Sequence, residues 1–356
     1  MVKRILGPSA ALLLFIGAAS AQTTKTVDVE GSPTFLEVNE TTHKAYILAG
    51  AGVSVLDGNA RVLTTIKTSG SPAGLAINPV TNRIYTVSAG DSSCTIIDGA
   101  TDTVITTVKT GSYPQTVAVN TATNKIYVAN NFGHTVTVID GVTHAATTFA
   151  VGRGPRGIAV NSKTNRAYTA NYGTSDTTLV EGGTHGATAI PTGKHPWVIS
   201  VDSGVNKTYV INEDSASLSI VDGATNRVAD VRVGEIPFAV TFNTANHRVY
   251  TLSYGNNTMA VIDPVAGKLI RTVRLAAQPS AVAVNSRTGN IYVAEQKTGN
   301  VAISSGATHA LLGKVKAGTI PYALAADSAA NKVYVANVYS GDVTVITDAA
   351  PKGNKP

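Results

Sequence analysis

Hydrophobic and polar residues alternate along most of the chain in short segments separated by Gly, Asn and Asp. After Pro114, four such segments follow one another: Gln115–Val119, Lys125–Ala129, Thr135–Ile139 and Thr147–Val151. Alternation with a period of two over such lengths, bounded by turn-forming residues, is typical of half-buried antiparallel strands. The pattern therefore predicts an all-β protein, and the four strands of this unit are called a, b, c and d in chain order.

The same unit recurs eight times, marked by a proline before strand a and by a tyrosine in strand b. The prolines are Pro33, Pro72, Pro114, Pro155, Pro196, Pro237, Pro279 and Pro321. The tyrosines are Tyr46, Tyr85, Tyr127, Tyr168, Tyr209, Tyr250, Tyr292 and Tyr334. Four-stranded units repeated at this spacing are typical of β-propeller blades, whose radial arrangement leaves few open strand edges.

The two ends of the repeat array indicate how the ring closes. The last unit finishes with a c strand, Val343–Ile346, and is followed by a Lys-, Pro- and Gly-rich segment where strand d is expected. A lone d-like strand, Lys25–Val29, precedes the first unit. We expect this strand to pair into the last blade, which gives an eight-bladed propeller of four-stranded antiparallel blades. The alternative is a seven-bladed ring with one detached unit, which would leave strand edges and apolar faces exposed.

Several repeated motifs resemble a known family. Tyr127–Asn130 and Tyr334–Asn337 read YVAN, Tyr168–Asn171 reads YTAN, Val138–Gly141 reads VIDG and Thr123–Ile126 reads TNKI. These motifs resemble the YVTN-type β-propeller repeat family over essentially the whole chain after its N-terminal segment. The resemblance implies an exported or surface propeller, and it supplies no catalytic motif. That family is often seven-bladed, and the count of eight more distantly resembles haem-d1-type propellers.

The N-terminal residues predict export. Lys3 and Arg4 precede an apolar run, Ala10–Ala19, and Ala19–Ala21 forms a small-x-small cleavage site, which is the order of a secretory signal peptide. A buried N-terminal helix is the alternative. We therefore expect a signal peptide at 1–21, one propeller domain at 22–349, a C-terminal tail at 350–356, and a periplasmic or secreted protein. No later apolar run approaches membrane-spanning length.

Charge and cysteine content narrow the function classes. Without Lys3 and Arg4, 26 of the 28 basic residues remain and face 22 acidic residues, a scattered excess that does not predict a nucleic-acid-binding stripe. Cys94 is the single cysteine and falls in a column of core hydrophobes, so we expect a buried, unreactive thiol. No metal, phosphate or nucleophile motif is found. The sequence thus predicts no catalytic residue, no metal and no cofactor, and we expect a monomer.

Comparing the repeats separates turn residues from candidate site residues. The position three before each tyrosine holds mostly Asn, which tolerates the left-handed conformation of a tight turn, so His43 and His247 are interpreted as turn residues rather than ligands. The c–d turns hold Asp57, Asp98 and their equivalents, which we expect to accept local backbone hydrogen bonds.

The d–a and b–c connections remain, and strand alternation places both on one face of the ring. Around the prolines, the d–a connections carry bulky or charged residues at the expected mouth of the central channel. The predicted binding residues from both connections are Tyr113, Asn130, Arg156, Asn171, His195, Trp197, Phe238, Glu295 and Tyr322. Aromatic side chains beside a few polar groups are typical of binding surfaces. The alternative is that these aromatics only fill a wide channel.

These features favour an exported recognition or scaffold protein, without catalysis, that binds a small ligand or a protein partner on the d–a/b–c face. One alternative is a lactonase-like propeller hydrolase or lyase using His195 and Glu295 at the channel mouth. Another is a cofactor-binding propeller, such as a haem-d1-like one. Nucleic acid is not an expected partner, because the basic excess is weak.

Overall fold

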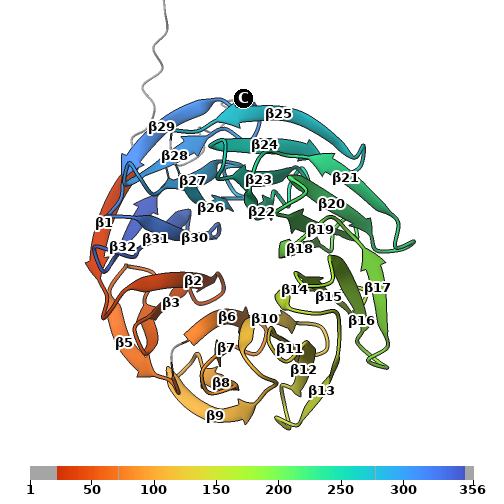
Figure 1. Ribbon diagram of the computed structural model, residues 1–356. Helices are drawn as coiled ribbons and strands as arrows, with labels where there is room; N and C mark the ends of the chain where they lie inside the picture. The colour runs from red at the N-terminus through yellow and green to blue at the C-terminus, as the bar shows by residue number, and fades with distance from the viewer. Residues whose placement is uncertain (1–21, 71, 277, 349–356) are drawn as a thin grey trace, which may run out of the picture.

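Eight four-stranded antiparallel sheets stand around a central axis in the computed structural model, which describes residues 22–70, 72–276 and 278–348 (Figure 1). This arrangement confirms the predicted all-β, eight-bladed propeller. The predicted signal peptide and the predicted tail at 350–356 lie outside the described residues. Among the described residues, no helix has the length and hydrophobicity needed to cross a bilayer.

Each blade runs from the channel to the rim through strands a to d. The innermost a strands are β2 (Pro33–Asn39), β6 (Pro72–Asn78), β10 (Pro114–Asn120), β14 (Pro155–Asn161), β18 (Pro196–Asp202), β22 (Pro237–Phe242), β26 (Pro279–Val284) and β30 (Pro321–Asp327). The b strands are β3 (Lys44–Ala49), β7 (Arg83–Ser88), β11 (Lys125–Asn130), β15 (Arg166–Asn171), β19 (Lys207–Asn212), β23 (Val249–Ser253), β27 (Ile291–Glu295) and β31 (Lys332–Asn337).

The outer half of each blade follows the same order. The c strands are β4 (Gly52–Leu56), β8 (Ser93–Asp98), β12 (Thr135–Asp140), β16 (Asp176–Glu181), β20 (Ser217–Asp222), β24 (Thr258–Asp263), β28 (Asn300–Ser304) and β32 (Asp342–Thr347). The d strands are β5 (Val62–Lys67), β9 (Thr103–Lys109), β13 (Ala146–Ala150), β17 (Ala187–Pro191), β21 (Val228–Arg232), β25 (Lys268–Arg274), β29 (Leu311–Lys316) and, for the eighth blade, β1 (Thr23–Asp28).

The eighth blade combines strands from opposite ends of the described chain. Its strand order is β1-β32-β31-β30, and β1 pairs antiparallel with β32 from Thr23 opposite Thr347 to Asp28 opposite Asp342. The strand begins two residues earlier than the Lys25–Val29 that alternation predicts. In Figure 1 the red β1 lies against the blue β32, so no blade lacks its outer strand.

The hydrophobic core lies between neighbouring blades. In one cluster, Tyr85 and Cys94 of the second blade pack against Val117 and Ile126 of the third. All eight repeated tyrosines are fully buried in such interfaces. Strands b and c are almost entirely buried, whereas the d strands expose most of their residues to solvent. Packing between blades, rather than within one blade, therefore stabilises the ring.

A polar ladder joins neighbouring blades at seven of the eight junctions. The last residue of strand a reaches the left-handed residue of the following blade's a–b turn: Asn39 Nδ2 donates to Asn82 Oδ1 at 2.9 Å, and Asn78 Nδ2 donates to Asn124 Oδ1 at 2.8 Å. Equivalent Asn–Asn bonds follow at three more junctions. The turn residues have positive φ, as their residue types predict.

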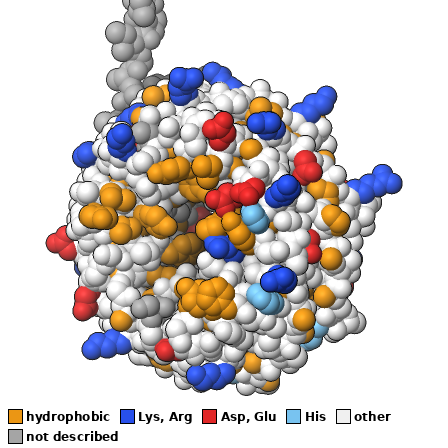
Figure 2. All heavy atoms as spheres, viewed as in Figure 1, with side chains coloured by type: hydrophobic (Ala, Val, Ile, Leu, Met, Phe, Trp, Pro, Cys, Tyr) orange, Lys and Arg blue, Asp and Glu red, His pale blue; other side chains and the backbone are white. Residues whose placement is uncertain are grey.

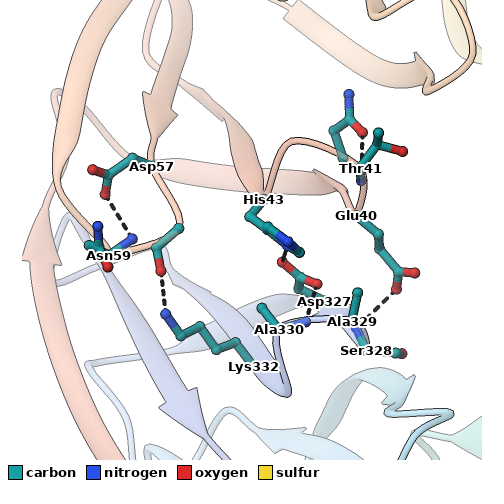
Figure 3. A network of polar contacts seen from close by, with 12 residues as sticks. Glu40, Thr41, His43, Asp57, Asn59, Asp327, Ser328, Ala329, Ala330 and Lys332 are labelled. Carbon is teal, nitrogen blue, oxygen red and sulfur yellow. Dashed lines mark hydrogen bonds and ion pairs between the residues drawn. The ribbon is translucent and has the colours of Figure 1, made fainter.

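At two junctions both asparagines of the pair are replaced, one by aspartate and the other by histidine. Where strand a ends in Asp202 or Asp327, the next turn holds His247 or His43, and the Nδ1–Oδ2 distances are 2.7 and 2.8 Å. The His43–Asp327 pair spans the junction between the eighth and first blades (Figure 3). These histidines are turn residues, as predicted, and they also hold adjacent blades together.

The replacement of both partners together predicts how substitutions at Asp327 and His43 affect the free energy of unfolding. Asp327→Asn alone should lower the free energy of unfolding by about 1–2 kcal/mol, because a charge-assisted bond to His43 is lost. Asp327→Asn combined with His43→Asn recreates the Asn–Asn pair of the other junctions and should recover most of that loss. Urea unfolding of the two single variants and the double variant measures these changes. If the loss of unfolding free energy in the double variant equals the sum of the losses in the single variants, the two residues do not act as a pair.

Burial of the tyrosines predicts alkaline unfolding. Burial raises the pKa of Tyr85 and of Tyr334 to about 12, and it raises the pKa of the other six repeated tyrosines above the ordinary 10.0. Below pH 10 both states keep the phenolic proton, so stability is unaffected. Above pH 10 the unfolded state loses protons that the folded state keeps, so stability falls as pH rises.

Each buried tyrosine should contribute about 1.4 kcal/mol per pH unit to that fall. We therefore expect Tyr85→Phe to reduce the slope of unfolding free energy against pH by about this amount between pH 10 and about 12. Urea unfolding across this interval, with Tyr113→Phe on the surface as the matched control, provides the measurement. Equal slopes for wild type and Tyr85→Phe would show that burial of this phenol does not lower stability at alkaline pH.

Candidate binding surface at the channel mouth

The d–a and b–c connections lie against each other, as strand alternation predicts. The backbone N–H of Asn131 donates to the carbonyl of Tyr113 at 2.9 Å, and that of Glu213 donates to His195 at 3.1 Å. The same bond links Tyr254 to Ile236 at 3.0 Å. In the third to eighth blades, the b–c loop is therefore fixed to the d–a loop of its own blade, and both present side chains on one face.

The residue before the blade proline has an unusual backbone. Proline normally moves its predecessor into extended conformations, yet several of these residues are left-handed. They are Tyr113 (φ 56), His195 (φ 53), Ile236 (φ 50), Gln278 (φ 48) and Ile320 (φ 56). For a β-branched residue this conformation is costly, and such strain gathers at functional sites. The conformation leaves Tyr113 and Ile236 substantially exposed, at 40% and 48%.

A column of stacked side chains forms beside the channel mouth between the fourth and fifth blades. The guanidinium carbon of Arg156 lies 4.0 Å from the ring centroid of Trp197 and 4.3 Å from that of Tyr172. Tyr172 also stacks on His195, with centroids 4.2 Å apart and planes at 8°. His195 Nδ1 in turn lies 2.6 Å from Asp214 Oδ2.

This column, defined as Trp197, Arg156, Tyr172, His195 and Asp214, fixes the orientation of Arg156. The guanidinium of Arg156 makes cation–π contacts with two rings that meet edge to face at 78°, while its N–H groups make no side-chain hydrogen bond to another described residue. A planar guanidinium with a free edge is suited to bind a carboxylate or phosphate through two parallel hydrogen bonds.

The other predicted aromatic residues lie apart from the column. Tyr113 stacks on Phe132 with centroids 4.2 Å apart, and Phe238 meets Tyr254 edge-on at 6.3 Å. Tyr322 is 49% exposed. Figure 2 shows a hollow at the centre of the ring rimmed by hydrophobic side chains, with charged and histidine side chains gathered on the side of β14 and β18. The mouth is therefore a partly aromatic rim around an open channel.

Acidic residues lie next to the column. A surface cavity of about 510 Å³ is lined by Lys194, Glu213, Asp214, Glu235 and Ile236. The mouth thus pairs one fixed cation with a neighbouring acidic and apolar area.

Asn130 and Asn171 were predicted to contact a ligand, and the structure corrects this. Both are fully buried. Asn130 Nδ2 donates to Thr137 Oγ1 at 2.9 Å, and Asn171 Nδ2 donates to Thr178 Oγ1 at 2.8 Å. These amides cross-link strands b and c within a blade, which explains why asparagine recurs at this position.

Glu295 is likewise buried and does not reach the mouth. Its carboxylate lies 2.7 Å from Lys314 Nζ and accepts the backbone N–H of Ala276 at 3.0 Å. Glu295 therefore replaces the structural asparagine with an ion pair inside the seventh blade. The structure brings Arg156, His195 and Trp197 together but leaves Glu295 apart from them. The alternative of a site that combines His195 and Glu295 at the channel mouth is therefore not met by the position of Glu295.

Within the described ranges, no group of three or more His, Cys, Asp or Glu residues could hold a metal ion. Cys94 is fully buried, and burial raises the pKa of its thiol to about 12, which agrees with the predicted unreactive thiol.

Two residues of the channel were not predicted from the sequence. Phe35 and Glu37 line cavities that also contain Trp197, and both belong to β2. Glu37 could have been found by comparing the interior of strand a across the repeats, because the equivalent positions are Ala, Ser or Thr.

Comparison with solved structures agrees with the fold and places the protein among the β-propellers. "Kuenenia stuttgartiensis Hydrazine Synthase" is 14% identical, with a TM-score of 0.62 over 94% of this chain and 99% of that chain. "Structure of U3-55K" is 11% identical, with a TM-score of 0.64 over 81% and 98%. The Cps50 (Swd1) β-propeller domain of Myceliophteria thermophila is 11% identical, with a TM-score of 0.62 over 79% and 98%.

At these identities the three structures show the fold alone. No protein-family profile matches the chain, so the likeness to YVTN-type repeats stays a resemblance of motifs. No curated protein matches it either.

The column predicts energetic coupling between Arg156 and Trp197. A double-mutant cycle with Arg156→Ala and Trp197→Ala should give a coupling of about 0.5–1 kcal/mol in urea unfolding, because the cation–π contact is lost in either single variant. The matched cycle with Arg153→Ala, on the exposed part of the same loop, should give a value near zero. Equal coupling in both cycles would contradict the stacked geometry.

Proposed function

We propose that this protein is an exported recognition module that binds a ligand or protein partner on its d–a/b–c face. The observation that carries the proposal is Arg156, held against the rings of Trp197 and Tyr172 with its hydrogen-bonding edge unused by described residues. Aromatic and arginine residues held in place before binding are typical of energetic hot spots, because little conformational freedom is lost on association.

The chemistry of the column favours a planar anion as the recognised group. A carboxylate or phosphate of the partner would accept two parallel N–H bonds from Arg156, while apolar parts of the partner would contact Trp197. Phe238 and Tyr322 would extend the apolar contact across the mouth. The N-terminal segment with the order of a signal peptide supports export to the periplasm or the exterior.

Titration with benzoate tests this proposal, because benzoate joins a carboxylate to an aromatic ring. Trp197 is the only tryptophan, so its fluorescence reports directly on the column. We expect a saturable fluorescence change in the wild type and affinity weaker by about tenfold in Arg156→Lys, since lysine lacks the planar fork.

Arg153→Lys, which changes an exposed arginine of the same loop, is the matched control and should leave affinity within about twofold. A non-saturable change, or equal weakening by the two lysine variants, would overturn the anion site.

A further inference from the structure

The wall of the central channel carries a carboxylate that the other blades lack. Glu37 lies opposite Tyr46 in the β2–β3 pairing. The residues that lie opposite the equivalent tyrosines in the other seven blades are Ala76, Ala118, Ala159, Ser200, Thr241, Ala283 and Ala325. A methyl or hydroxyl therefore satisfies the packing at this position, and packing does not account for a glutamate.

Glu37 occupies the middle of the channel. Three cavities of about 650, 570 and 400 Å³ lie along the channel, and Glu37 lines all three. Its carboxylate makes no hydrogen bond or ion pair to another described residue. Solvent reaches the side chain through the channel, so it is only partly buried by surface area, yet the surrounding wall raises its pKa to about 7.

Other charges near Glu37 are few. The inner strands β6, β10, β22 and β26 contain no charged residue. Glu40 lines two of the cavities, and its Oε1 accepts the backbone N–H of Ser328 at 3.0 Å. Arg156 lines the third cavity and is held in the column.

The remaining charges close to the channel wall already have partners. Asp202 and Asp327 end their strands bound to His247 and His43. On the adjoining strand β3, Lys44 pairs with Asp102 at 2.7 Å. No described cation therefore neutralises Glu37, although burying an unpaired carboxylate is unfavourable.

Aromatic rings lie between Glu37 and the mouth. The largest cavity is lined by Phe35, Trp197, Phe238 and Tyr322, contributed by four different inner strands. This cavity opens in the hollow of Figure 2. Aromatic faces attract cations, and apolar walls favour a ligand with a hydrocarbon body. A hard metal ion fits poorly, because it would need several more oxygen ligands than one carboxylate supplies.

We propose that the central channel is a second binding site, which takes a small organic cation with its ammonium group against Glu37 and its apolar body among the aromatic rings of the mouth. The site goes beyond the anion recognition proposed for Arg156, since it uses a different charged residue and the opposite ligand charge.

Choline is the test probe, and dimethylbutanol, its neutral carbon analogue of the same shape, is the matched control ligand. We expect calorimetric titration at pH 9 to show choline binding at least about tenfold more tightly than dimethylbutanol, because only choline gains the attraction of Glu37. Glu37→Gln should remove this preference. Glu40→Gln makes the same charge change along the same channel and should leave choline affinity within about twofold.

The titration of Glu37 gives a second readout that needs no variant. Choline keeps its charge at every pH, so its affinity should follow the ionised fraction of Glu37 and be weaker at pH 5 than at pH 9 by about the same factor as in Glu37→Gln, at least about tenfold. The pH dependence of choline affinity in the wild type therefore tests the channel site even if Glu37→Gln does not fold.

Equal binding of the two ligands, equal losses in Glu37→Gln and Glu40→Gln, or affinity independent of pH would each overturn the channel site. The two proposals fail separately: Arg156→Lys should weaken benzoate but not choline, and Glu37→Gln should weaken choline but not benzoate.

Discussion

The architecture depends on the contact between the end of an inner strand and the left-handed turn of the next blade, which is made at seven of the eight junctions. The partners are Asn and Asn at five junctions and Asp and His at two, so the contact is kept while its chemistry changes. Single hydrogen bonds of this kind contribute only about 1 kcal/mol each. Repeated around the ring, they fix the position of one sheet against the next and align the tyrosines that fill each interface.

Because this ladder lies at the a–b turns, the opposite face is free of that structural role. The d–a and b–c loops need only return the chain to the next strand, and their side chains can vary from blade to blade. That freedom explains why Arg156, Trp197 and His195 occur once each while the turn residues recur. Candidate functional residues of a propeller are therefore those that differ from the equivalent residues of the other blades and have no structural role that explains the difference.

The same distinction between recurring and unique residues explains which features of the fold and of the candidate site could be predicted from the sequence. Blade number, strand positions and the shared loop face follow from a pattern that recurs eight times. Asn130 and Asn171 were misassigned although their recurrence is itself a structural signal, since hydrogen bonding within a blade needs the same amide each time. Glu295 breaks the pattern but finds Lys314 inside its blade, a pairing between strands that spacing alone does not reveal. Glu37 was missed because alternation does not separate residues facing a channel from residues facing a core.

The composite eighth blade also bears on how the chain reaches its folded state. β1 and β32 are among the first and last described segments, so their pairing closes almost the largest loop that the chain can form. Seven blades can assemble from neighbouring segments in the order of synthesis, whereas the eighth waits for the final strand. Until then β1 has no β32 to pair with, and both flanks of the open ring are unsealed. Completion of the toroid therefore requires a pairing between strands from both ends of the described chain.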